Sequence, residues 1–590
     1  MFAINHRRRS SSVTRRGRQV PITEQLEVRA LMTSWVGQIG GAGTESVQSR
    51  AVLDSAGNMY VGGFFMATAD FDTNQATSNL TSAGDSDAFV AKYSSAGNLI
   101  WARQFGGIGA DVTNGLRLDP SEGSLYLTGT FTGSADFTGD GAPDLTSAGG
   151  SDVFVVKLNP ATGSTVWQKS VGGASTDNGY DIVAINNRVF IAGDFKNTAD
   201  FNPSATINSL TSAGKGSNRL SDGFILTLTD TGTYVSVWQV GGAYEDTVTG
   251  LAADGNNIYA SGQIKGTVDI DPTSSVYSIN APSSAYSMFI ASYSSTGKAN
   301  WGKLITGSIP ANVAYLGNDN GSLYLTGEFG TTANFNVNGS GGNLTCAGTV
   351  DAFIAKYSMA DGGFAWAQKY GGAGYDTVRG AAVVNPADGS VFVGGWYKGD
   401  LDFNPGPGNG GEVSNAGGTD NFILQLEANG SYRNSWRMGG AENDGAAKPV
   451  GVLNNTLYVT GRFQLTADFP TGTTLSSFGS LDAFVMAIDL PGTAPFLTTT
   501  SSTQSVEQPL SVTDYQSVSV NSQGQSLPTD SDTSVMPRRN TGVQKLGSIV
   551  ALSGTADYTA VSAAPLIDAV FSQLTIRDLD LFGTLLSRHR

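Results

Sequence analysis

The chain has 590 residues and a net charge of −16, from 34 Lys and Arg against 50 Asp and Glu. This acidic balance argues against nucleic acid as a partner, since phosphates are bound by cationic surfaces. The only histidines are His6 and His589, and Cys346 is the only cysteine. The middle of the chain therefore has no Ser-His-Asp or Cys-His triad and no histidine- or thiolate-rich zinc site. A single cysteine also excludes an intrachain disulfide. No apolar run reaches the ~18 residues of a membrane-spanning helix, so we expect no transmembrane segment.

The first segment, residues 1–32, is a basic leader. Its arginines are followed by Ser, Thr, Gly and Pro rather than by the apolar stretch of an ordinary secretory signal. At its end, Leu26, Glu27, Arg29 and Leu31 form a pattern that resembles the LE-x-R-x-L leader of exported planctomycete proteins. The resemblance implies export to the cell surface or beyond. A basic arm without an export role is the alternative.

Seven tryptophans mark a repeat that fills the middle of the chain. Successive tryptophans are 66, 66, 71, 63, 65 and 70 residues apart, and self-similarity at a near-fixed period indicates a repeat architecture. Each repeat contains short runs rich in Val, Leu, Tyr and Phe, separated by Gly, Asp, Asn and Pro, which is the chemistry of strands and turns. The repeats begin at Trp35, Trp101, Trp167, Trp238, Trp301, Trp366 and Trp436.

Four such runs in each repeat predict an all-β fold, a seven-bladed β-propeller of four-stranded blades over residues 33–490. The period exceeds the ~40–50 residues of simple blades, so each blade should carry one enlarged loop. The first repeat starts at its tryptophan strand and the last one ends without such a strand. We therefore expect the N-terminal strand to complete the seventh blade and to close the ring without a free edge.

The rest of the chain has a different composition. Residues 491–560 are rich in Ser and Thr and poor in core-forming residues, which predicts a flexible, disordered linker. Within residues 561–590, apolar residues after Pro565 share one face of a possible amphipathic C-terminal helix. Such a helix would dock on a partner, on the propeller or on a sorting receptor, or would form locally without a partner.

The tryptophans allow two interpretations. An indole can pack between neighbouring blades, or it can serve as an aromatic platform for sugars. Regular placement on a strand favours packing. Trp396, in VFVGGWYKG, breaks the register of the others and replaces the small residue before the usual aromatic, so it is the candidate for an exposed, ligand-binding ring.

One face of the propeller should carry all of the long loops. In an up-and-down blade, the loops after the second and fourth strands emerge on the same face, and both contain recurrent acidic residues. Hard cations bind closely spaced Asp and Asn oxygens, so the long loops are candidate calcium sites. The alternative is that each Asp closes an Asx turn and accepts backbone N–H groups. The candidate metal ligands are Asp70, Asp72, Asp136, Asp140, Asp269 and Asp271.

Several elements recur in fixed order: Gly-Gly with Asp, then YVGGF or YLTGTF, then ADF, then DAFVAKY. This order resembles the bacterial β-propeller repeat family known as SBBP repeats, over about three-quarters of the chain. The resemblance implies a surface or secreted propeller, generally without an assigned activity, and it supplies no catalytic residues.

Three functions follow as hypotheses. The first is an exported, non-enzymatic scaffold for binding or adhesion at the cell surface, whose long-loop face binds a polysaccharide, a matrix component or a surface protein. The second is a polysaccharide hydrolase or lyase that uses paired carboxylates. The third is a structural envelope protein. An enzyme should gather non-repeated acids near the channel mouth, whereas the acids considered above recur with the repeat.

Overall fold

The computed structural model describes residues 34–491, except for 75, 215–219, 274–275, 308–313, 320, 338 and 405–409. The predicted leader, the predicted C-terminal helix and all but the first residue of the predicted linker lie outside the described residues. What is described consists of strands and turns, and it includes no helix long and apolar enough to cross a membrane.

The described strands pair antiparallel in seven sets, each with four strand positions. In the first and sixth sets, two short strands share the first position. The first set is β2 (Glu45–Val47) with β3 (Val52–Leu53), β4 (Met59–Phe65), β7 (Asp87–Tyr93) and β8 (Leu99–Gly107); the second is β9 (Val112–Leu118), β10 (Leu125–Asp136), β11 (Leu145–Leu158) and β12 (Thr165–Gly173). The third is β13 (Asp177–Ile185), β14 (Arg188–Phe195), β17 (Asp222–Thr229) and β18 (Tyr234–Val240); the fourth is β19 (Thr247–Ala253), β20 (Asn257–Ile264), β23 (Ser287–Ser294) and β24 (Ala299–Ile305).

The remaining sets have the same order. The fifth is β25 (Ala314–Asp319), β26 (Ser322–Phe329), β29 (Asp351–Ser358) and β30 (Phe364–Tyr370); the sixth is β31 (Thr377–Val378) with β32 (Val383–Val384), β33 (Val391–Tyr397), β36 (Asp420–Leu426) and β37 (Tyr432–Gly440). The seventh is β38 (Gly445–Leu453), β39 (Thr456–Phe463), β42 (Asp482–Asp489) and β1 (Trp35–Gly41).

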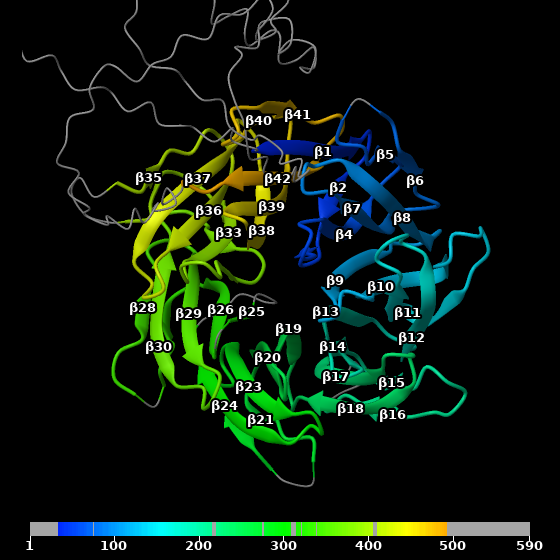
Figure 1. Cartoon of the computed structure of the whole chain (residues 1–590). Coiled ribbons are helices and arrows are strands. Elements are labelled where there is room, and N and C mark those ends of the chain that lie inside the picture. The colour runs from blue at the N-terminus through cyan, green and yellow to red at the C-terminus, as the bar shows by residue number, and fades with distance from the viewer. Residues whose placement is uncertain are drawn as a thin grey trace, which may run out of the picture. The chain divides into compact units, whose positions relative to one another are not determined.

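This arrangement confirms the all-β propeller class. Figure 1 shows the strand sets side by side around a common centre, with β1 beside β42. In that pair Trp35 lies opposite Ala487 and Ile39 lies opposite Ala483, although more than 440 residues separate them in the chain. Such a pairing is the one that closure of the ring by the N-terminal strand requires.

The long connections between second and third strands fold into short hairpins in place of irregular loops. Alternating Thr-Ala-Asp and Asn-Leu-Thr segments pair because their alanine and leucine side chains share one face. In the second set, β10 and β11 extend to make the same ladder. The hairpins are β5 (Thr68–Asp70) with β6 (Asn79–Thr81), β15 (Thr198–Asp200) with β16 (Ser209–Thr211), β21 (Thr267–Asp269) with β22 (Ser278–Asn280), β27 (Thr332–Asn334) with β28 (Asn343–Thr345), β34 (Leu401–Asp402) with β35 (Glu412–Val413), and β40 (Thr466–Asp468) with β41 (Thr474–Ser476).

The Gly-Gly pair at the end of an outer strand joins one blade to the next. Gly106 and Gly107 of β8 pair with Asp136 and Ala135 of β10. A Cβ on Gly107 would lie 2.0 Å from the Ser134 carbonyl oxygen, so only glycine allows this approach. The recurrent Gly-Gly in the sequence is therefore a junction between blades.

Aromatic side chains fill the space beneath most of the hairpins, whereas Ile264 and Ile270 take two of these places in the fourth blade. Phe71, from the ADF element of the first blade, is fully buried. Its ring lies 5.4 Å from that of Phe65 on β4, nearly perpendicular to it, and 5.0 Å from that of Phe89 on β7. Edge-to-face contacts of this kind stabilise a core beyond the area that they bury.

The repeated tryptophans pack between blades. The indole N–H of Trp101 donates to the Pro160 carbonyl of the next blade at 3.2 Å, and the Trp101 side chain is only 7% exposed. Trp35, Trp167, Trp301 and Trp366 make the same kind of bond to a turn of the following blade. This placement matches the packing interpretation of the tryptophan repeat.

Candidate functional site

The acidic residues predicted as metal ligands lie in the hairpin loops of three different blades. Their oxygens accept backbone N–H groups: Asp70 from Asp72 and Ser78, Asp72 from Asn74, Asp136 from Thr138, Gly139 and Gly141, Asp140 from Ala142, Asp269 from Asp271 and Tyr277, and Asp271 from Thr273 and Ala299. These are the bonds of Asx turns. Across the described ranges, no three acidic, histidine or cysteine side chains converge as they would around a metal.

A second group of recurrent acids lies at the blade junctions. Asp111 accepts the N–H of Gly107 at 2.8 Å and the N–H of Thr132 at 3.0 Å, and Asp87 accepts the N–H of Ala83. Both carboxylates are fully buried. Burial, with a contribution from Asp87, raises the pKa of Asp111 to about 6. The same bonds recur around the ring, so these acids organise the junctions.

The non-repeated residues are found at the long-loop end of the second strands. Each second strand places one residue opposite the second residue of its third strand, as Phe64 lies opposite Ala88 and Trp396 opposite Asn421. The positions on either side of this residue hardly change from blade to blade. At the position itself, however, no two blades carry the same residue. We call these seven positions the mouth ring: Phe64, Thr130, Asp194, Gln263, Glu328, Trp396 and Arg462.

Trp396 is half-buried in the mouth ring and stacks on a second aromatic ring. Its ring centroid lies 5.2 Å from that of Tyr375, with 15° between the planes. Tyr375 in turn donates its hydroxyl to Glu328 of the preceding blade at 2.8 Å. The ring predicted as an exposed platform is therefore one side of an ordered aromatic pair that bridges two blades.

Positive charge gathers beside this pair, on the sixth and seventh blades. Arg379 follows β31, Lys448 lies on β38 and Arg462 on β39. Burial, Arg379 and Arg462 lower the pKa of Lys448 to about 7, so the three cations are close enough to repel one another. In the part of the chain that the structure describes, none of the three forms an ion pair.

Acidic side chains also lie along the mouth ring. Asp194 and Glu328 belong to the mouth ring, and Glu245 precedes β19. The Tyr286 hydroxyl donates to Glu245 at 2.8 Å, and Asn178 donates to Asp194 at 3.2 Å. Burial and the nearby Glu245 carboxylate raise the pKa of Asp194. Acidic groups therefore lie beside the cations as well, because, despite burial, the Tyr315 hydroxyl and the Glu328 carboxylate raise the pKa of Arg379.

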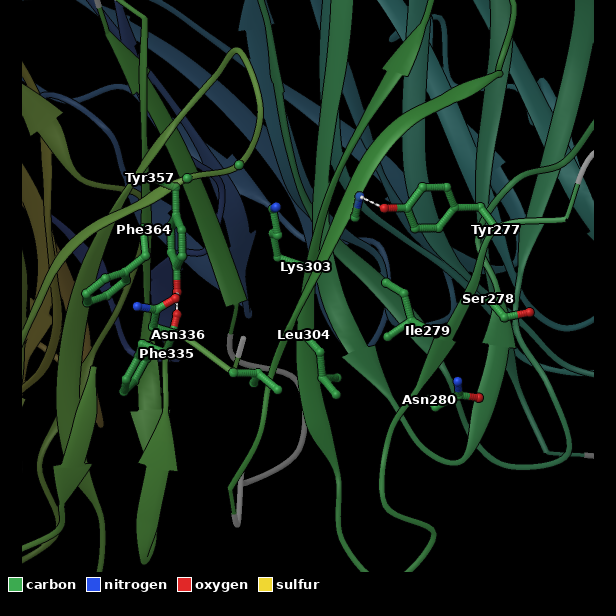
Figure 2. A pocket seen from close by; sticks show the side chains of 14 residues that line it. Tyr277, Ser278, Ile279, Asn280, Lys303, Leu304, Phe335, Asn336, Tyr357 and Phe364 are labelled. Carbon is green, nitrogen blue, oxygen red and sulfur yellow. Dashed lines mark hydrogen bonds between the residues drawn. The ribbon is translucent and has the colours of Figure 1, made fainter. Parts of the chain in front are cut away.

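A separate groove of about 550 Å³ lies at the outer edge between the fourth and fifth blades. Figure 2 shows Tyr277 on one side, Phe364 on the other, and Lys303 between them. The Tyr277 hydroxyl accepts the N–H of Gly302 at 3.2 Å, so it caps part of the β24 edge. Phe335 and Tyr357 line the groove but are at most 2% exposed, so its accessible aromatic surface comes from Tyr277, which is 36% exposed, and from the half-buried Phe364.

The sequence analysis placed the candidate ligand site on the long-loop face, where the mouth ring lies, but named only Trp396 of its members. The cations Arg379, Lys448 and Arg462 were missed because they are far apart in sequence. A signal was available: aligning the second strands on their third-strand partners isolates one position that changes in every repeat.

Comparison with known proteins gives limited information. No family model matches the chain. The regulatory protein FlaEY of Caulobacter vibrioides is 25% identical over 432 residues, which cover 70% of this chain but 42% of that protein. The chain therefore spans less than half of the length of this relative.

Solved structures give similarly distant likenesses. The quinohemoprotein alcohol dehydrogenase ADHIIG of Pseudomonas putida HK5 has a TM-score of 0.36 at 11% identity, covering 79% of this chain and 78% of that one. The phage phi92 endosialidase has a TM-score of 0.35 at 10% identity, covering 90% and 80%. Likenesses of this size carry no argument about function.

Proposed function

We propose that the protein is an exported, non-enzymatic scaffold that binds an acidic polysaccharide at the mouth of its long-loop face. The observation that carries this proposal is the mouth ring, the position at which every repeat has a different residue. A framework of recurrent blade junctions holds seven different side chains in one register, which is the arrangement of a binding surface on a rigid scaffold. The resemblance of residues 26–31 to an export leader supports display outside the cytoplasm.

The ligand class follows from the chemistry of the three cations at the mouth. Lys448 donates to the Val47 and Gln48 carbonyls and Arg379 has Glu328 nearby, so Arg462 is the cation of this group with most capacity for a ligand, and an arginine fork matches the geometry of a carboxylate. The faces of aromatic rings suit the apolar faces of sugar rings. The Trp396–Tyr375 pair beside Arg462 and Arg379 therefore fits an acidic sugar, with its carboxylate on the arginines and its ring against the indole.

The test is calorimetric titration of the full chain with a uronic acid oligomer and with a neutral oligosaccharide of equal length. We expect saturable binding of the uronic acid oligomer only, weakened at least tenfold by Arg462→Gln or Trp396→Ala. Arg103→Gln, which changes an exposed arginine on the outer strand β8 and outside the mouth ring, is the matched control and should bind as the parent does. Equal binding of both oligomers, or no binding of either, would refute the proposal.

A hydrolase or lyase remains the second candidate, because Asp194 and Glu245 are non-repeated acids that lie close together. A paired acid and base could cleave a bound glycan. Depolymerisation of the uronic acid oligomer that is abolished by Asp194→Asn would replace the scaffold proposal with this one.

A further inference from the structure

A cavity of about 510 Å³ opens on the other face of the propeller, where tight turns join first and second strands. We call it the turn-face funnel. Its walls come from the inner strands of four blades and are mainly aliphatic, including Leu53, Leu118, Val384 and Leu453. Its volume falls within the ~300–1,000 Å³ range of small-molecule sites.

Two arginines lie at the inner end of the turn-face funnel. Arg50 and Arg117 line the cavity, and each precedes the turn residues of its own strand, Asp54 and Asp119, so the arginines lie deeper than the rim. The Arg50 guanidinium donates to the Leu316 carbonyl at 3.2 Å. Because Arg50 belongs to the first blade and Leu316 to the fifth, this bond joins two blades that are not neighbours in the ring.

The guanidinium groups have donors to spare. Arg117 donates Nε–H to the Ile182 carbonyl at 3.4 Å, whereas a guanidinium carries five N–H donors. The nearest carboxylate, Asp181, accepts the backbone N–H groups of Ile182 and Leu251, both at 2.8 Å. Throughout the described ranges, neither arginine has an acidic group within ion-pair distance.

The charge of the turn-face funnel differs between its inner end and its rim. The inner end carries two guanidinium groups beside Asp181, whose pKa is raised by burial. At the rim, Asp54 is paired with Lys92 at 3.4 Å, and Glu122 accepts the N–H of Ser55 at 2.7 Å. Asp119 at the same rim accepts the N–H of Ser124, so hydrogen bonds hold the rim acids in place, and the cationic inner end is the part of the funnel that an anion would bind.

We propose that the turn-face funnel binds an aliphatic carboxylate, with its carboxylate on Arg50 and Arg117 and its chain along the aliphatic walls. Each part of the ligand meets a matching surface: the fork of a guanidinium accommodates a carboxylate, and the walls gain from covering apolar area. Burial and the neighbouring Arg117 lower the pKa of Arg50 to about 9, a penalty that a bound anion would relieve.

The experiment is calorimetric titration of the full chain with decanoate and, separately, with decanol. We expect saturable decanoate binding that falls at least tenfold in Arg50→Gln and in Arg117→Gln, while any binding of decanol is the same in parent and variants. Arg103→Gln is the matched control, because Arg103 is an exposed arginine on the outer strand β8. Its decanoate affinity should equal that of the parent.

A second variant distinguishes loss of the binding site from loss of the fold. Val384→Trp keeps both arginines but fills the cavity, so it should weaken decanoate and decanol together and leave binding of the uronic acid oligomer at the mouth ring unchanged. Absent decanoate binding, equal affinity for decanoate and decanol, or an equal loss in Arg103→Gln would each overturn the proposal. None of these outcomes depends on whether the mouth ring binds a glycan.

Discussion

The buried acids at the blade junctions predict that the protein loses stability as the pH rises from 5 to 8. Asp177 is 1% exposed and accepts the N–H groups of Gly173 and Lys196 at 2.7 and 3.0 Å. Burial, with smaller contributions from Asp152 and Asp194, raises its pKa to about 7. The folded state therefore keeps a proton on this carboxyl at pH 5 that the unfolded chain has already lost.

The sign and size of the effect follow from this proton. Because the folded state binds more protons than the unfolded state between pH 4 and 7, the free energy of unfolding falls as the pH rises through that window. Each pH unit is worth about 1.4 kcal/mol, so Asp177 alone contributes at most about 4 kcal/mol, which is an upper limit. Other junction acids add to the slope: Asp111 and Asp152 with pKa values of about 6, Asp246 and Asp444 about 7, and Glu45 about 8.

Urea unfolding at pH 5, 6, 7 and 8 measures this slope. Asp177→Asn should lower stability at pH 5 by about 1–3 kcal/mol, since an amide oxygen cannot replace both acceptors, and should flatten the decline toward pH 8. Asp85→Asn, which changes an exposed aspartate, should keep the slope of the parent. If the parent is as stable at pH 8 as at pH 5, or if Asp177→Asn retains the full slope, the junction carboxyls are not protonated as inferred.

Two further predictions concern the repeat. Trp101→Phe removes the indole N–H that donates to the Pro160 carbonyl while keeping an aromatic ring. Because Tyr60 and Lys92 also donate to this carbonyl, we expect a loss of only about 0.5–1.5 kcal/mol in urea unfolding; a loss near zero would mean that the bond adds nothing. Asp136 accepts three backbone N–H groups in its loop, so Asp136→Asn should lower the melting temperature equally in millimolar calcium and in chelator. If calcium instead raises the melting temperature of the parent and not that of the variant, the loop is a cation site.

Most of the fold could be predicted from the sequence because the signals for the strands and turns of each blade lie within one repeat. The tryptophan spacing, the alternation of apolar and polar residues and the Gly-Gly signals occur within one blade. The long connections were predicted as loops, yet segments such as Thr68–Asp70 form hairpins, since their strand partners lie about ten residues away, across a turn with no strong signal. The recurrent acids were assigned to turns or cations, and the structure places Asp111 in a buried junction with the preceding blade.

The sequence by itself determined the propeller class, the repeat period and the face on which the loops gather, because these depend on local patterns that occur seven times. Only the tertiary structure decided which non-repeated side chains meet. Arg462 lies near Trp396, and Arg50 reaches Leu316 in a blade that is not its neighbour, although each pair is separated by at least one blade in the sequence. Closing a ring brings distant residues together through backbone geometry, and no periodicity in the chain encodes which individual residues then become neighbours.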